Sequence, residues 1–123
     1  MAGVNIPINI ASKDTRDKIK KYLQVLYQFH KLTDKEVEIT TELVMSYSLL
    51  LKRYDKDVAN QLIFSTENKK KIRAVLGMDD PIFQNYLSNL RKKKVIVDKT
   101  ISPQYIPPAK DFNLIFKFNE TTD

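Results

Sequence analysis

The sequence predicts a mostly α-helical domain with a small β-hairpin, and three observations support this fold class. Apolar residues recur every three or four positions over much of residues 14–93, which is the period of helices with one buried face. Polar capping residues and a glycine mark where these helices begin and end. After residue 94 the pattern changes to β-branched residues, turn residues and prolines, which is typical of short strands.

Composition favours one domain over residues 1–123, because the chain is 42% hydrophobic and 29% charged. The absence of cysteine excludes disulfides, thiolate nucleophiles and thiolate zinc sites, and it suits a reducing cytosol. Only two glycines argue against a glycine-rich phosphate-binding loop. No segment approaches the roughly 18 apolar residues that span a bilayer, and residues 1–10 lack the features of an export signal. We expect a cytoplasmic protein without a membrane partner.

The first half of the chain predicts an extended arm and two long helices. Within the expected arm, residues 1–12, apolar side chains stand at every second position from 4 to 10, and Pro7 restricts a strand there to an edge or an arm. A helix over residues 14–32 would bury Ile19, Tyr22, Leu23, Leu26, Phe29 and Leu32. Thr33 and Glu36 form a capping-box pattern that starts a second helix, which extends to about residue 53. This helix would bury Val37, Val44, Tyr47, Leu50 and Leu51, and a short apolar segment, 58–64, follows it.

The second half predicts two shorter helices and then strands. Ser65 is a suitable N-cap for a helix over residues 66–76, and Gly77 is placed to end it. Asp79 or Asp80 caps the next helix, residues 81–93, with Pro81 in its first turn. Two strands would then form a hairpin on either side of the turn residues 98–100, with apolar positions Val95, Ile96, Val97, Ile101, Tyr105 and Ile106. Residues 111–118 alternate aromatic or aliphatic with polar side chains, so a last strand would lay its apolar face on the core.

Two helices joined by a tight turn and followed by a hairpin are the plan of a winged helix-turn-helix. Residues 65–106 resemble bacterial and phage winged-helix regulators and plasmid replication initiators. The resemblance is carried by Leu-Gly-Met-Asp-Asp-Pro at 76–81, the apolar series Phe83, Leu87, Leu90 and Ile96, and the basic run Arg-Lys-Lys-Lys at 91–94. Family members usually have a glycine just before the wing strand, where this chain has Lys94, and the expected wing also lacks glycine. Residues 14–64 would then be a helical support, and residues 109–123 a C-terminal strand and tail.

Positive charge is concentrated in this part of the chain. The net charge is +6, and residues 66–100 hold nine basic against four acidic residues. Such a concentration favours a phosphate-binding surface, and the alternative is a solvated lysine face.

Helical geometry separates the core side of helix 81–93 from its outer side. If the apolar series faces the core, five side chains that suit base edges point outward: Gln84, Asn85, Ser88, Asn89 and Lys92. Six further basic residues are expected to contact phosphates: Lys69, Lys70, Lys71, Arg91, Lys93 and Lys99.

Other candidate chemistry is weaker. His30, the only histidine, lies on or beside the apolar face of the first helix, which is more typical of a core-edge residue than of a base or ligand. Acidic residues at 36, 38, 42, 79 and 80 lack calcium-loop spacing, and capping explains three of them. We therefore expect no enzymatic activity, no metal and no cofactor.

The leading hypothesis is a protein that binds double-stranded DNA, as a transcriptional or replication regulator of a phage or mobile element. Most of its 21 basic residues are lysine, as AT-rich coding produces. Helices 14–53 or the terminal strands would serve a homodimer or an assembly partner. The alternative is a structural or adaptor protein of a phage particle, in which the terminal strands extend a neighbour's sheet and the location is the virion. A small inhibitor of a host enzyme is a third reading, for which no particular residue argues.

Overall fold

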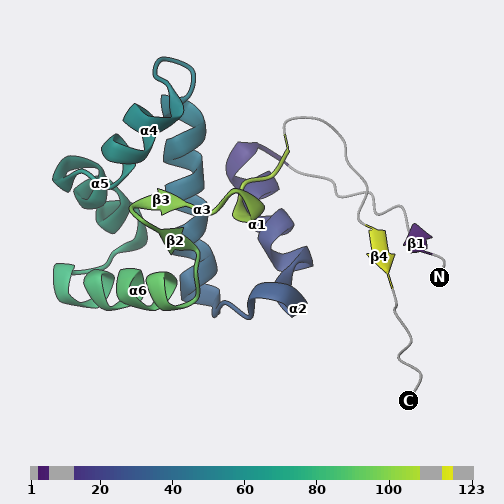
Figure 1. The fold of residues 1–123 in the computed structure, drawn as a ribbon. Coiled ribbons are helices and arrows are strands. Elements are labelled where there is room, and N and C mark those ends of the chain that lie inside the picture. The colour runs from purple at the N-terminus through teal and green to yellow at the C-terminus, as the bar shows by residue number, and fades with distance from the viewer. Residues whose placement is uncertain (1–2, 6–12, 109–114, 118–123) are drawn as a thin grey trace.

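The computed structural model describes residues 3–5, 13–108 and 115–117, and in this part of the chain the protein is mostly helical. Figure 1 shows the helices gathered around one long central helix, with a short two-stranded sheet packed against them. The helices are α1 (Thr15–Val25), α2 (Tyr27–His30), α3 (Asp34–Leu50), α4 (Lys56–Ile63), α5 (Thr66–Leu76) and α6 (Asp80–Lys92), followed by a 3₁₀ turn, η1 (Pro103–Tyr105). The strands are β1 (Gly3–Asn5), β2 (Ile96–Val97), β3 (Thr100–Ile101) and β4 (Ile115–Lys117).

The central helix α3 organises the core because it contacts α1, α4, α5 and α6. It buries residues on most of its circumference, and these include the aliphatic Ile39, Leu43 and Val44. Its start is the predicted capping box: the Thr33 hydroxyl accepts from the Glu36 N–H, and the Glu36 carboxylate accepts from the Thr33 N–H. The helix ends at Leu50, three residues before the expected end.

The single helix expected over residues 14–32 is interrupted at Leu26, so that prediction is wrong in part. Leu26 leaves helical geometry with ψ of 8°, and α2 ends at Lys31 in the left-handed region. Because of this break, His30 faces inward, whereas Phe29 is 68% exposed. Phe29 was expected in the core, and the interruption explains why it is not. Leu51, expected on the buried face of the second helix, is also exposed, because it lies beyond the end of α3.

The short apolar segment at 58–64 belongs to a helix, α4, which the sequence analysis did not assign. Asp55 caps it by accepting a hydrogen bond from the Val58 N–H, and Ala59 and Ile63 are fully buried.

The two helices that follow begin and end close to the predicted positions. Ser65 caps α5, and Gly77 ends it with φ of +65°, the left-handed conformation that glycine adopts without steric cost. Asp79 caps α6, and Pro81 lies in its first turn. The apolar series Phe83, Leu87 and Leu90 is fully buried.

The hairpin forms from β2 and β3, which pair antiparallel with Ile96 opposite Ile101. Asp98 and Lys99 form its turn with φ of 51° and 59°, and positive φ at both central residues is typical of a type I′ turn. Thr100 begins β3, so the turn is one residue shorter than predicted. The second strand ends early, because η1 begins at Pro103.

The terminal strands β1 and β4 form a separate antiparallel pair, with Val4 opposite Phe116. In Figure 1 this pair lies to one side of the helices. The rest of the expected arm and tail, and the packing of the tail's apolar face on the core, lie outside the described residues. Among the helices of the described part, none has the length and apolar character needed to cross a membrane.

Candidate nucleic-acid interface

The outer side of α6 presents the side chains that the sequence predicts as base readers. Asn85, Asn89 and Lys92 are exposed, and Ser88 is half-buried. The opposite side of the helix is held by the fully buried apolar series, so the orientation of α6 about its own axis is fixed by packing. The four polar side chains are therefore displayed together on a rigid element.

Gln84, the fifth predicted base reader, is half-buried and lies on the side of α6 that carries Asp80. Its Nε2 donates to Asp80 Oδ1 at 3.3 Å, and the same carboxylate oxygen lies 3.7 Å from Arg73 Nη1 of α5. A bidentate contact to adenine uses both the amide nitrogen and the amide oxygen, so Gln84 must first release Asp80.

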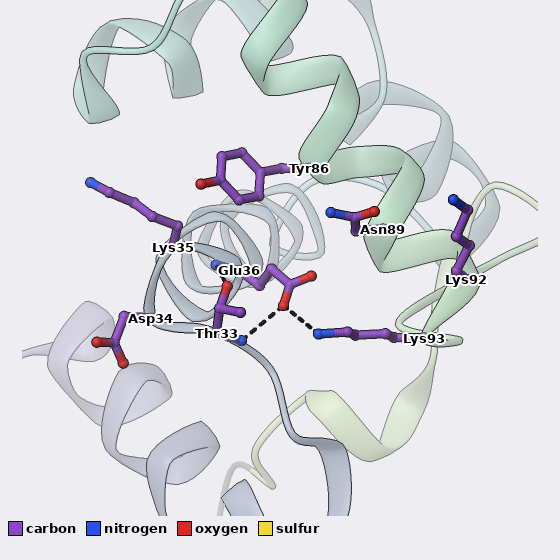
Figure 2. Close-up of a pocket in the computed structure, with 8 residues that line it drawn as sticks. All are labelled: Thr33, Asp34, Lys35, Glu36, Tyr86, Asn89, Lys92 and Lys93. Carbon is purple, nitrogen blue, oxygen red and sulfur yellow. Dashed lines mark hydrogen bonds and ion pairs between the residues drawn. The ribbon is translucent and has the colours of Figure 1, made fainter.

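A hollow of about 540 Å³ lies between the start of α3 and the second half of α6 (Figure 2). Two predicted base readers, Asn89 and Lys92, line it from α6. Tyr86 and Lys35, which the sequence analysis did not select, line it as well. The full lining is Thr33, Asp34, Lys35, Glu36, Tyr86, Asn89, Lys92 and Lys93. The outer side of α6 is thus continuous with a concave surface that reaches α3.

Lys93, a predicted phosphate contact, is already engaged within the protein. Its Nζ lies 2.6 Å from Glu36 Oε1 and donates to the Lys31 carbonyl at 3.3 Å. The Glu36 side chain is only 2% exposed. Burial acts to raise the pKa of Glu36, but the hydrogen bonds from Lys93 and Thr33 together outweigh it and leave this pKa below its usual value.

The other predicted phosphate contacts are distributed over α5, the end of α6 and the hairpin. Lys70, Lys71, Arg91 and Lys99 are exposed, and Lys69 is half-buried. Lys71 Nζ lies 4.0 Å from Glu67 Oε1, and both side chains are exposed to solvent. Such a solvated ion pair is weak, so Lys71 remains available for a phosphate.

The structure adds three lysines to this surface that the sequence analysis did not select: Lys31, Lys35 and Lys94. The Lys31 backbone meets the end of α6 through the Lys93 ammonium. Lys94 directly follows α6 and adopts φ of 65°. A lysine at the position where the regulators that this chain resembles usually have glycine is visible in the sequence and points to Lys94. The position of Lys31 depends on tertiary packing and has no signature in the sequence.

His30 is held by two backbone groups. Its Nε2 lies 2.5 Å from the Leu23 carbonyl, and its Nδ1 accepts from the Leu32 N–H at 2.9 Å. With both ring nitrogens engaged, His30 joins α1, α2 and the segment that leads into α3.

In comparisons with known proteins, no family model, no curated protein and no solved structure matches the chain.

Proposed function

We propose that the protein binds double-stranded DNA as a winged helix-turn-helix, with α5 and α6 as the helix-turn-helix and β2–β3 as the wing. The observation that carries this proposal is the outer side of α6, where amide, hydroxyl and ammonium groups stand on a helix fixed by fully buried residues. Such a helix, of about 13 residues, suits a major groove.

The backbone before the wing supports the proposed fold. The regulators that this chain resembles usually have a glycine at the position of Lys94, and Lys94 adopts the left-handed conformation that glycine favours. The departure in sequence is thus accompanied by a glycine-like backbone.

The proposed division of labour follows the chemistry of the side chains. Asn85 and Asn89 have the paired donor and acceptor that match adenine, and Lys92 can donate to guanine. Ser88 and Gln84 complete the base-reading set. The exposed Lys70, Lys71, Arg91 and Lys99, with Lys69, would contact phosphates, which strengthen binding without selecting sequence.

We further propose the setting that the sequence favours, a transcriptional or replication regulator of a phage or mobile element acting in the host cytoplasm. Homodimerisation through residues 14–53 or the terminal strands would let it recognise two half-sites.

Substituting one base reader and one phosphate contact tests the division of labour. Asn85→Ala should relax the sequence preference at one position by about 1–3 kcal/mol, because it removes a bidentate contact. Lys70→Ala should weaken binding to all sequences alike, because phosphates carry no base identity. Selection from a random duplex pool measures the first effect, and titration of unrelated duplexes measures the second. An Asn85→Ala protein that keeps the wild-type preference would contradict the assignment of α6.

A second candidate function, a structural or adaptor protein of a phage particle, is favoured by the β1–β4 pair. Within the described residues each of these strands has three residues and one unpaired edge. Two-stranded sheets of this length are marginal in water, and an added strand from a partner would stabilise them. Light scattering and proteomics of particles test this reading: a monomer or dimer that is absent from particles would rule it out.

A further inference from the structure

We propose that Lys93 does not contact DNA but acts as a positioning residue: through Glu36 it holds the end of α6 against the first turn of α3. This inference rests on the proposed function of α6 and deepens it, since it names the group that holds the C-terminal end of the base-reading surface against α3.

Three segments meet at one carboxylate oxygen. Glu36 Oε1 accepts from Lys93 Nζ at 2.6 Å and from the Thr33 N–H at 2.8 Å, and the same ammonium donates to the Lys31 carbonyl at 3.3 Å. The pair therefore links the segment before α3, the first turn of α3 and the residue that caps the end of α6. Figure 2 shows the Lys93 side chain extending across the hollow toward Glu36.

Burial of Glu36 makes separation of the Lys93–Glu36 pair unfavourable. The Glu36 side chain is 2% exposed, whereas that of Lys93 is 35% exposed. If Lys93 turned outward to a phosphate, a carboxylate would remain buried without its cation, which is a strongly unfavourable arrangement. Repulsion between that carboxylate and the phosphate would add to the cost.

The neighbouring lysine provides a natural comparison. Lys92 is exposed, and its ammonium has no hydrogen-bond or ion-pair partner within the part of the chain that the structure describes. In Figure 2 its side chain points away from Glu36. Lys92 and Lys93 carry equal charge at adjacent positions, yet only Lys92 is free to meet DNA.

The position of the pair also explains what it orients. Asn89 lies four residues before Lys93, so the two share one side of α6 and both line the hollow. Core packing sets the rotation of α6 about its axis, and the link from Lys93 to α3 holds the last turn of the helix, with Asn89, in place against α3.

The salt dependence of DNA binding separates a phosphate contact from a positioning residue. We would titrate a random-sequence duplex and an AT-rich duplex over a range of salt concentrations. The proteins compared are the full chain, the phosphate-contact variant Lys70→Gln, the single variants Lys93→Gln and Glu36→Gln, and the double variant Glu36→Gln/Lys93→Gln. Glutamine at position 36 keeps the capping box, and the double variant leaves no unpaired buried charge.

Lys70→Gln should make the slope of log Kobs against log salt shallower by about 0.9, as loss of one phosphate contact does. Lys93→Gln should keep the wild-type slope but bind roughly tenfold more weakly. A tenfold loss lies within the range of coupling free energies measured between residues in contact. Glu36→Gln should change binding in the same direction, and the double variant should bind no more weakly than either single variant. A shallower slope for Lys93→Gln, or tighter binding with a steeper slope for Glu36→Gln, would overturn the proposal.

Hydrogen exchange of the free protein tests the positioning role without DNA. Glu36→Gln should accelerate amide exchange at the end of α6 and at residue 31, in addition to the first turn of α3. Acceleration confined to residues 33–37 would overturn the positioning role. Failure of the wild-type protein to bind either duplex would contradict the proposed function alone.

Discussion

At the residue scale, the backbone conformation of Lys94 stands out, because it places a side chain with a Cβ in the left-handed region. The same holds for Lys31, Asp98 and Lys99 among the described residues. The left-handed conformation raises the free energy of an L-residue by about 1–2 kcal/mol. Lys94 adopts it in the short connection where the chain turns from α6 into β2. The Lys94 carbonyl also accepts a hydrogen bond from the Ser102 hydroxyl at 2.6 Å, which holds the backbone of Lys94 in place.

Replacing this lysine by glycine should therefore stabilise the protein. Lys94→Gly should raise the free energy of unfolding by about 1 kcal/mol, because the gain from removing the strain exceeds the entropy that glycine adds to the unfolded chain. The matched control is Lys70→Gly in the exposed middle of α5, which should lower it by about 1 kcal/mol. Urea denaturation measures both changes. Equal destabilisation by the two substitutions would show that position 94 carries no strain.

The lowered pKa of Glu36 leads us to expect that the free energy of unfolding decreases in acid. Its pKa in the folded protein is below the usual value near 4.5, so the folded state favours the ionised carboxylate. This contribution is complete above pH 4.5 and is lost as the pH falls through the lowered pKa. Glu36→Gln should consequently flatten the decline of unfolding free energy below that pH. Denaturant titrations across the acid range test this, and parallel pH profiles for the two proteins would contradict it.

At the element scale, α1 is joined to α3 by a bidentate ion pair. Arg16 Nε lies 2.7 Å from Glu42 Oε2, and its Nη2 lies 3.0 Å from Oε1. The Glu42 side chain is only 9% exposed, although Arg16 is half exposed. The pair thus adds a directional contact to the packing of these two helices.

Removing Arg16 should loosen α1 from α3. Arg16→Ala should lower the free energy of unfolding by about 1 kcal/mol, a value reduced for the exposure of the arginine. Lys35→Ala is the control, because the Lys35–Glu38 pair is more exposed and should contribute only a few tenths of a kcal/mol. Thermal or urea unfolding distinguishes the two, and equal small effects would mean that the bidentate geometry adds nothing.

The elements that sequence predicted well are those specified by neighbouring residues. α5 and α6 are capped by Ser65 and Asp79, and Gly77 ends the first of them, so their limits followed from local chemistry. The interruption at Leu26 was missed because it is supported by the bonds of the His30 ring to Leu23 and Leu32. Those bonds exist only in the folded chain.

The candidate site shows the same division. Helical periodicity correctly placed Asn85, Asn89 and Lys92 on the exposed side of α6. It could not distinguish Lys93 from Lys92, because the partner of Lys93 lies 57 residues away in the sequence. The hollow between α3 and α6 was equally invisible, since it arises from the packing of two distant helices.

At the scale of the whole molecule, two surfaces suggest two kinds of partner. The outer side of α6, the hairpin and α5 carry most of the excess positive charge, whereas the β1–β4 pair has unpaired edges among the described residues. Affinity for DNA should fall steeply as ionic strength rises, because a contact with many phosphates releases many counterions. Affinity for a protein partner should depend much less on ionic strength.

The most direct test of the central claim, that α6 and its basic neighbours bind DNA, is the salt dependence of wild-type binding to a random-sequence duplex. We predict binding that falls steeply and linearly in log–log form, with a slope of about −4.5 if each of the five proposed phosphate contacts meets one phosphate. Absence of binding at low salt, or binding that does not change as salt rises, would contradict the account.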